Sequence, residues 1–214
     1  MKIDPDTFER SLYRTMTGAV VPRPIGWIST TSEDSAEQGS AATSSGDEPR
    51  DGTDNLAPYS FFNVVSVDPP VVMFAPVDKG ADALKDSARN AIETGEFVHN
   101  VVTEPVVEAM NATSATLPPE ESEFDHADLE RAPCEKVDAP RVATADIAFE
   151  CELYDAIDIG ISTLILGEIV MVHVDESVTT DDGKVDVEKV DAVGRLAGNW
   201  YARTDDRFRL ERPP

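Results

Sequence analysis

The residues best suited to chemistry in this chain stand at the predicted start of a helix, in the segment LKDSARN at positions 84–90. Asp86 is a residue type that often caps helix N-termini, and apolar residues follow it at helical spacing. A helix N-terminus presents unpaired N–H groups and a partial positive charge, so it attracts anions such as phosphate. Lys85, Ser87 and Asn90 would add an ammonium group, a hydroxyl and an amide. Taken alone, the segment is explained more simply as a capped helix preceded by a surface lysine.

A second segment, NLAPYSFFN at positions 55–63, places polar side chains at the entry to an apolar strand. Such an arrangement suits a planar ring that is apolar on its faces and forms hydrogen bonds along its edge. Pro58 lacks a backbone N–H, and we expect it to keep this stretch out of strand pairing and open to a ligand. A strand with a ragged start would explain the same residues.

A third segment, PRPIGWIST at positions 22–30, combines a rigid start with a strand. Prolines on both sides of Arg23 restrict the backbone and exclude a helix, so its side chain stands on a rigid base from which it could reach an anion. Trp27 alternates with Ile25 and is expected in the core. Ser29 and Thr30 end the strand, where hydroxyl groups can face a ligand.

The histidines and cysteines predict neither a metal site nor a catalytic set. His99 and His173 lie inside apolar strands and are expected to be structural, whereas His126 lies in an acidic loop and is freer to meet a ligand. There is no HExxH motif and no carboxylate cluster of metal-site spacing. Cys134 and Cys151 form no CxxC motif, so two free thiols in a reducing compartment are expected. We assign no catalytic acid, base or nucleophile.

The composition of the chain is strongly acidic. Among 214 residues, 42 are Asp or Glu and 18 are Lys or Arg, which gives a formal net charge of −24. Charge of this sign argues against nucleic acid and anionic membranes as partners, because both require a basic face. Dispersed negative charge is also typical of surfaces adapted to high internal salt, as in halophilic archaea; an ordinary acidic cytosolic protein is the alternative. The N-terminal segment has no apolar signal region, so a cytoplasmic location is expected.

The order of predicted elements favours a mainly β fold. Strands are predicted near residues 25–30, 61–67, 69–77, 96–102, 146–159 and 163–176, and short helices near 6–14, 86–94, 105–115 and 127–131. Helices and strands do not alternate regularly, and no GxGxxG or GxxxxGK[ST] motif is present. Residues 31–54 are an acidic, low-complexity loop insertion without aromatic or large aliphatic residues. One domain over 1–214, a closed or partly closed antiparallel barrel with peripheral helices, is expected.

Six blocks of sequence, taken in order, resemble a known family. They are MTGAVVPRPIGWIST, NLAPYSFFNVVSVDPPVVMF, KDSARNAIETGEFVHNVV, FECELYD, LGEIVMVHVDE and GRLAGNWY, and together they span roughly residues 10–202. The chain resembles the flavin reductase-like family of FMN-binding split barrels, especially its flavoredoxin branch. The resemblance implies a Greek-key split β-barrel with peripheral short helices, and a homodimer with FMN near the subunit interface.

The resemblance also implies a site. Ser29 and Thr30 would lie near the ribityl-phosphate, and Lys85, Asp86, Ser87 and Asn90 would form the phosphate end. The isoalloxazine ring would be framed, largely by backbone groups, by Asn55, Ala57, Pro58, Tyr59, Ser60 and Phe61. Arg23 and His126 are looser candidates, and Arg195 could serve either the site or the interface.

The activity implied is that of an FMN-dependent oxidoreductase in which NADH or NADPH reduces flavin. Two alternatives stay open: an FMN-bearing electron-transfer protein that has a redox partner and no NAD(P)H activity, and a flavin-binding barrel without turnover. The chain departs from the family pattern in the length of its 31–54 loop, and in Ala197 where a second glycine is commoner. Both departures concern the access side of the flavin.

Overall fold

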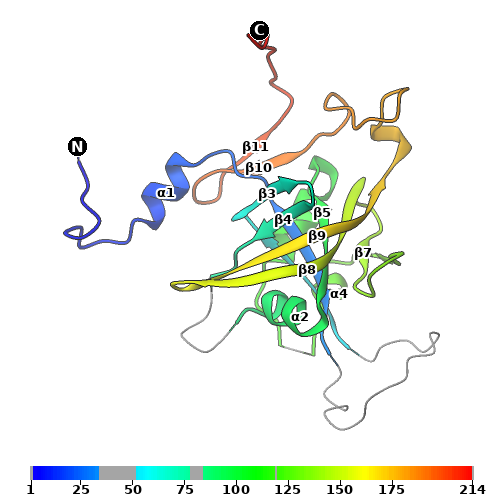
Figure 1. Cartoon of the computed structure of the whole chain (residues 1–214), viewed down its shortest axis with the longest axis horizontal. Coiled ribbons are helices and arrows are strands. Elements are labelled where there is room, and N and C mark those ends of the chain that lie inside the picture. The colour runs from blue at the N-terminus through cyan, green and yellow to red at the C-terminus, as the bar shows by residue number, and fades with distance from the viewer. Residues whose placement is uncertain (1, 34–51, 78–83, 119, 214) are drawn as a thin grey trace.

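The computed structural model describes residues 2–33, 52–77, 84–118 and 120–213. Its centre is an antiparallel sheet (Figure 1). The sheet has seven strands in the order β2-β1-β5-β8-β9-β4-β3. The strands are β1 (Gly26–Thr31), β2 (Asp54–Tyr59), β3 (Phe62–Val67), β4 (Pro70–Phe74), β5 (Glu96–Val101), β8 (Ile147–Ile159) and β9 (Ser162–Val174). Two small hairpins pair β6 (Arg131–Ala132) with β7 (Arg141–Val142) and β10 (Val193–Arg195) with β11 (Tyr201–Arg203).

Short helices surround this sheet, as predicted. They are α1 (Tyr13–Ala19), α2 (Asp86–Thr94), α3 (Val107–Ala112) and α4 (Glu123–His126), together with the 3-10 turns η1 (Glu104–Val106) and η2 (Glu176–Val178). Within the described ranges, none of the helices has both the length and the apolar character needed to cross a membrane. The mainly β, split-barrel prediction is confirmed.

The sheet closes on itself because its two edge strands follow each other in the chain. β2 ends at Tyr59 and β3 begins at Phe62, so only Ser60 and Phe61 join the two edges. The ring of Phe62 reaches across the interior to β5, where its centroid lies 4.2 Å from that of His99. A Cβ atom on Gly26 would lie 2.5 Å from the Phe62 ring, so this crossing requires glycine in β1.

The interior of the barrel is aromatic and is closed at one end by α2. Phe74 and Phe97 meet edge to face with centroids 5.1 Å apart, and Ala88 and Ala91 of α2 pack against the same cluster. Gly167 of β9 lies opposite Leu153, at a point where the register of the β8–β9 ladder shifts between Leu153 and Asp155. Glycine is also required there because a Cβ atom would lie 2.3 Å from the Phe97 ring.

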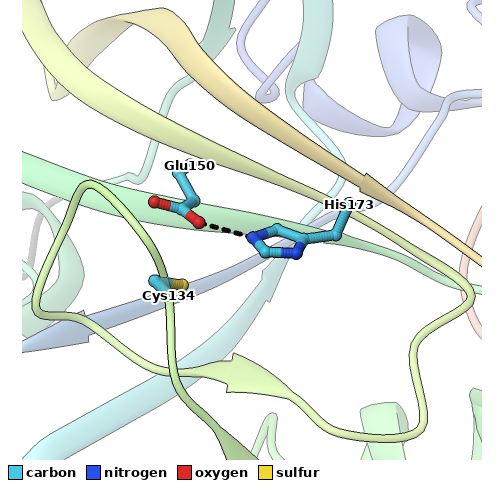
Figure 2. Close-up of side chains that lie close together, drawn as sticks. All are labelled: Cys134, Glu150 and His173. Atoms are coloured by element: carbon cyan, nitrogen blue, oxygen red, sulfur yellow. Dashed lines mark hydrogen bonds and ion pairs between the residues drawn. The ribbon is translucent and has the colours of Figure 1, made fainter.

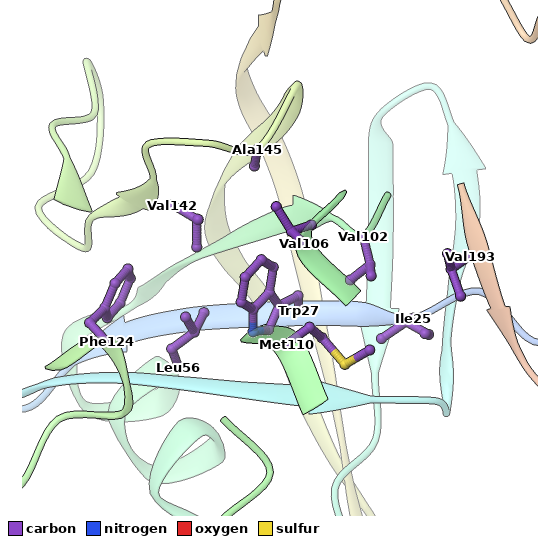
Figure 3. Close-up of a cluster of buried hydrophobic side chains, with 10 residues drawn as sticks. All are labelled: Ile25, Trp27, Leu56, Val102, Val106, Met110, Phe124, Val142, Ala145 and Val193. Carbon is purple, nitrogen blue, oxygen red and sulfur yellow. The ribbon is translucent and has the colours of Figure 1, made fainter. Parts of the chain in front are cut away.

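A second apolar cluster covers the outer face of β1 and β2 (Figure 3). It contains Ile25, Trp27, Leu56, Val102, Val106, Met110, Phe124, Val142, Ala145 and Val193. Trp27 is fully buried and its Nε1 donates to Thr113 Oγ1 at 2.9 Å, which confirms its predicted place in the core. Because the barrel lies on one side of β1 and this cluster on the other, every residue of β1 is buried.

Two predicted helices and one predicted loop differ from the structure. The first helix lies at Tyr13–Ala19 rather than at 6–14, and the helical turn expected at 127–131 lies at Glu123–His126. Ser122 sets the start of that turn, because its Oγ accepts a hydrogen bond from the N–H of Phe124. At the flanks of the predicted 31–54 insertion, Thr31 and Asp54 pair in the β1–β2 ladder. Residues 34–51 lie outside the described ranges.

Candidate functional site

The segment 55–60 forms a regular edge strand, which corrects the expectation that Pro58 keeps it unpaired. Pro58 lies opposite Trp27 in the β1–β2 ladder, and β2 has a neighbour on one side only. An edge strand tolerates a residue without an N–H on its open side. The open side of β2 therefore comes from its position at the sheet edge, and two cavities lie beside it.

The larger cavity has a volume of about 780 Å³ and lies where β2 meets the β10–β11 turn. Its walls come from α1, the segment before β1, the end of β2, α3 and that turn. The lining residues are Tyr13, Thr17, Arg23, Ile25, Pro58, Ser60, Val107, Glu108, Met110, Asn111, Ser114, Arg195, Leu196, Gly198, Asn199 and Tyr201. This volume lies within the range of about 300–1,000 Å³ that is usual for ligand sites.

The smaller cavity, of about 140 Å³, joins β2 to the start of α2. It is lined by Asn55, Ala57, Pro58, Tyr59, Lys85, Asp86, Ser87, Thr113, Ser114, Ala115, Thr116, Leu117 and Glu123. Most of the residues predicted for the ring and phosphate ends therefore meet around one hollow. Pro58 and Ser114 line both cavities, so the two adjoin along β2.

A chain of hydrogen bonds runs along the wall of the smaller cavity. Ser87 Oγ donates to Asn55 Oδ1 at 2.6 Å, and the Tyr59 hydroxyl donates to Ser87 Oγ at 3.0 Å. Asn55 Nδ2 in turn donates to Glu123 Oε2 at 2.9 Å, and the N–H of Leu56 donates to the same oxygen at 3.0 Å. This network fixes the Ser87 hydroxyl and the Asn55 amide beside the start of α2. Glu123 is the member that sequence reasoning missed.

The start of α2 differs by one residue from the prediction. Lys85, with extended backbone angles, is the N-cap, and Asp86 is the first helical residue. The Asp86 carboxylate is bound to Arg89 Nη2 at 2.6 Å, and among the described residues no side chain caps the helix. N–H groups in the first turn of a helix lack intrahelical acceptors, so an uncapped start is suited to bind an anion.

Glu123 brings a buried carboxylate to the same cavity. Its exposed fraction is 7%, and burial raises its pKa above the ordinary value. The N–H groups that it accepts from act against this shift, while the nearby Asp86 carboxylate adds to it. A buried acid with few donors favours its neutral form.

The structure does not bring Ser29 and Thr30 to either cavity. Both are fully buried: Ser29 Oγ donates to the carbonyl of Pro140 at 2.6 Å, and Thr30 Oγ1 accepts from Asn90 Nδ2 at 3.2 Å. Asn90 itself lies one layer deeper, where it lines a space of about 30 Å³ together with Asn55 and other residues. The sequence pattern could not reveal that β1 is covered on both faces, which leaves its terminal hydroxyls inside the protein.

The looser candidates fall in three different places. The Arg23 guanidinium donates to the carbonyls of Thr17 (2.7 Å), Val20 (2.6 Å) and Leu196 (3.0 Å), so it ties together the wall of the larger cavity. His126 is exposed at the end of α4, and Phe61 lies in the link between β2 and β3. The structure brings neither His126 nor Phe61 to the two cavities.

Arg195 lies at the larger cavity. Its guanidinium stacks over the Tyr201 ring at 4.5 Å from the centroid, and its Nη2 donates to the carbonyl of Gly198. The Tyr201 hydroxyl donates to Asn111 Oδ1 at 3.2 Å. These contacts hold the β10–β11 turn in place as one wall of the larger cavity.

A second polar cluster lies away from the cavities and joins Cys134, Glu150 and His173 (Figure 2). Their ligand-type atoms lie within 4.8 Å of one another, an arrangement that spacing in the sequence did not predict. Glu150 Oε1 accepts from the N–H of Glu135 at 2.8 Å and pairs with His173 Nε2. Its Oε2 accepts from the N–H groups of Lys136 (2.6 Å) and Val137 (3.2 Å).

The contacts of this cluster indicate a structural role. Burial acts to raise the pKa of Glu150, but the N–H donors and His173 outweigh it and hold the pKa below its ordinary value. Burial, with the Glu150 charge, raises the pKa of the Cys134 thiol to about 12, so the thiol stays protonated. Cys134 and Cys151 are free thiols, as predicted. The carboxylate thus fastens the loop after Cys134 to β8 and β9.

His99 fills the barrel interior. It stands between the rings of Phe62 and Phe149, and burial lowers its pKa to about 3, so it is neutral. Its Nδ1 is buried and has no hydrogen-bond partner among the described residues. His99 is thus buried inside the barrel, as expected for a structural residue, but its Nδ1 is not satisfied by any residue that the structure describes.

With this geometry in place, comparison with known proteins decides the family. The model of the flavin reductase like domain matches residues 17–187. The chain belongs to the flavin reductase-like family. An uncharacterized protein of Aquifex aeolicus is 37% identical over 201 residues, which cover 94% of each chain.

Two solved structures of the family are similar along nearly the whole chain. Nitrilotriacetate monooxygenase component B from Bacillus cereus is 35% identical, with a TM-score of 0.84 and 98% of both chains covered. Pseudomonas fluorescens 2-nitrobenzoate 2-nitroreductase is 33% identical, with a TM-score of 0.82 and 100% and 96% covered. These relatives are bacterial, which gives no support to the expectation of a halophilic archaeal source.

Proposed function

We propose that this flavin reductase-like protein is an FMN-dependent oxidoreductase in which NADH or NADPH reduces the flavin. The FMN phosphate would lie in the smaller cavity at the start of α2, and the ring would lie along the open side of β2 toward the larger cavity. The observation that carries the proposal is the uncapped start of α2, with Lys85 and Ser87, in a cavity that adjoins the larger one along β2.

The residues present fit such a cofactor at both ends. At the phosphate end, Lys85 supplies an ammonium group that makes no ion pair among the described residues, and Ser87 supplies a hydroxyl whose proton, now donated to Asn55, would turn to the phosphate. Charge-assisted hydrogen bonds of this kind are the strong contacts in anion sites. At the ring end, Pro58 and Ser60 of the β2–β3 corner face the larger cavity. The Asp86 and Glu123 carboxylates are the unfavourable neighbours.

When bound, FMN supplies the hydride and electron chemistry, and the protein supplies binding, orientation and electrostatics. In this chain, Lys85 and Ser87 would bind the phosphate, and the backbone of β2 would set the plane of the ring. The β10–β11 turn, with Arg195 over Tyr201, would bound the space for the second substrate and limit the entry of water. No side chain is needed as an acid or base.

A second candidate function is an FMN-bearing electron carrier that meets a redox partner. The relative from Bacillus cereus is named as component B of a monooxygenase, and that from Pseudomonas fluorescens as a nitroreductase. The first name favours a chain that works beside a second protein, and the second favours one that reduces a small molecule itself. The volume of the larger cavity favours a small second substrate.

The visible spectrum of the purified protein tests the proposal. FMN should bind and produce a flavin spectrum, and NADH or NADPH added without oxygen should bleach it. A bound flavin that stays oxidised with either nucleotide would favour the electron carrier. A colourless protein that does not take up added FMN would refute both.

We also propose that the protein is a homodimer. Support comes from the open edge strand β3, where Val64, Val65 and Val67 expose 53%, 53% and 88% of their surface. Apolar residues at a sheet edge are commonly covered by a partner. Light scattering coupled to gel filtration should give twice the mass of the 23.2 kDa chain. A monomer at micromolar concentration would contradict this.

The acidic surface carries a further proposal, that the fold is adapted to high salt. A formal net charge of −24 disfavours the compact state by repulsion, and counter-ions relieve this repulsion. The melting temperature should therefore rise as KCl is added into the molar range. A melting temperature that stays constant or falls over this range would refute the adaptation.

A further inference from the structure

Glu123 lies in the part of the proposed site where a negative charge would repel the phosphate. It lines the smaller cavity together with Lys85 and Ser87, yet it is itself a carboxylate with an exposed fraction of only 7%. Its Oε2 is held by Asn55 Nδ2 at 2.9 Å and by the N–H of Leu56 at 3.0 Å. The carboxylate is thus fixed one side chain away from Ser87, which lies in the first turn of α2.

The positive charges around Glu123 are already engaged elsewhere. Arg131 Nε pairs with Asp54 at 2.8 Å and its Nη1 with Asp125 at 2.8 Å, and Arg89 pairs with Asp86 at 2.6 Å. Among the described residues Glu123 is in no ion pair. The charged and titratable groups that face it from the surrounding elements are Asp54, Tyr59, Lys85, Asp86, Arg89, Glu121, Asp125 and Arg131. Lys85 alone adds a positive charge that is not already paired.

We propose that Glu123 takes up one proton from solvent when the FMN phosphate enters the smaller cavity, so that flavin binding is coupled to protonation of the site. This inference rests on the proposed function, which places the phosphate there. The carboxylate becomes a carboxylic acid, and its carbonyl oxygen still accepts from Asn55 and Leu56. Asn55 therefore keeps its orientation while the repulsion between Glu123 and the phosphate disappears.

Two observations support the protonation of Glu123 on phosphate binding. Burial already raises the pKa of Glu123, and the Asp86 carboxylate adds to the shift. A phosphate carries a charge between about −1.5 and −2 near neutral pH, so its arrival raises the pKa further. FMN affinity should then fall as pH rises between the pKa of Glu123 in the free protein and in the complex, by at most about tenfold per pH unit. Riboflavin has no phosphate and should show no such dependence.

Titration calorimetry of the flavin-free protein measures the proton directly. FMN and riboflavin are titrated between pH 6 and 8 in two buffers that differ in ionisation enthalpy, which gives the number of protons taken up on binding. FMN should bind more tightly than riboflavin, with an uptake that approaches one proton, and riboflavin should give an uptake near zero. An infrared difference spectrum of the wild-type complex should show a new carboxylic acid band with FMN and none with riboflavin.

Two matched variants assign the proton. Glu123→Gln keeps the acceptor for Asn55 and Leu56 but carries no charge, so the FMN-linked uptake should vanish. Its FMN affinity at pH 8 should increase by about tenfold, as expected for the loss of one nearby like charge, and its riboflavin affinity should stay the same. Glu121→Gln removes an exposed acid two residues before Glu123 and should leave the proton count unchanged.

The outcomes separate this inference from the proposed function. Equal affinity for FMN and riboflavin would remove the phosphate from the smaller cavity and overturn the proposed site itself. Tighter binding of FMN without proton uptake, or an uptake that persists in Glu123→Gln, would overturn the role of Glu123 and leave the FMN site intact. If Glu123→Gln fails to fold, the wild-type infrared band decides, because a proton on the phosphate gives no carboxylic acid signal.

Discussion

Glu123 and Glu150 are both buried glutamates, and their surroundings differ in the number of hydrogen-bond donors, in the charged neighbours and in access to a cavity. Glu150 is fully buried and accepts from three consecutive backbone N–H groups, with His173 beside it (Figure 2). Glu123 accepts at one oxygen from an amide side chain and one backbone N–H, and it borders a cavity. Their pKa values accordingly move in opposite directions, down for Glu150 and up for Glu123.

This difference shows how a fold separates a structural acid from one that can respond to a ligand. A carboxylate whose oxygens are all engaged is stable as an anion, and its loss leaves several donors unpaired. A buried carboxylate with fewer donors beside a cavity has a raised pKa, which favours its neutral form. A negative charge that enters the cavity then shifts this acid to its neutral form, whereas Glu150 stays an anion.

The largest effect that the comparison predicts is on stability. Glu150→Ala leaves one buried N–H group, two part-buried N–H groups and His173 without an acceptor, and should lower the free energy of unfolding by about 3–5 kcal/mol. Glu123→Gln, which keeps its acceptor, should change it by less than about 1 kcal/mol. Urea unfolding followed by circular dichroism measures both. Equal losses in the two variants would show that the donor count does not distinguish the two acids.

The next largest effect is on FMN binding in the smaller cavity, which Glu123 lines. Ser87→Ala and Lys85→Ala should each weaken FMN binding by about 1–3 kcal/mol, the usual loss for a charge-assisted hydrogen bond. Riboflavin affinity should change little, because the changes act on the phosphate. In molar KCl the loss in Lys85→Ala should shrink more than that in Ser87→Ala, since salt screens a point charge more than a hydroxyl. Unchanged FMN affinity in both variants would place the phosphate elsewhere.

Glu150→Gln is the control that tests whether the Glu150 cluster affects FMN binding at the smaller cavity. It should disturb the loop after Cys134 but leave FMN affinity within about twofold of wild type, because Glu150 lines neither cavity. A loss of FMN affinity as large as that in Ser87→Ala would mean that the two clusters are energetically coupled. The distinction between Glu150 as a structural acid and Glu123 as an acid that responds to the ligand would then be wrong.

Local sequence signals predicted six strands of the central sheet and most residues of the smaller cavity, but they missed β2. Apolar runs located β1, β3, β4 and β5, and Lys85 and Ser87 were predicted as site residues from their place at the start of a helix. The cap of α2 was predicted one residue late. Asp86 has the favoured residue type for a cap, but its carboxylate pairs with Arg89, and Lys85 takes the extended conformation of the cap.

Glu123 and the Glu150 cluster could not be predicted, for a physical reason. Glu123 meets Asn55 across 68 positions of the chain, and it stands in an acidic stretch of a chain with 42 acidic residues, where one more glutamate carries no signal. Ser29 was placed at the ligand because its strand ends there, but packing on both faces of β1 encloses it. Which acid is buried, and which strand is covered twice, depends on tertiary contacts that periodicity does not encode.

The smallest effect, the dependence of stability on pH, is the one that compares the two acids most directly. The pKa of Glu150 is lowered in the folded state, so the stability it contributes is present above its unfolded value, about 4.5, and is lost as pH falls through the folded value. The pKa of Glu123 is raised, so its contribution is present at low pH and is lost as pH rises through the folded value. Relative to wild type, Glu150→Gln should therefore lose most stability near neutral pH and least in acid, whereas Glu123→Gln should gain as pH rises. Each difference should be on the order of 1 kcal/mol between pH 4 and 7. Unfolding curves of the two variants that stay parallel to wild type across this range would mean that neither carboxyl changes its proton affinity on folding.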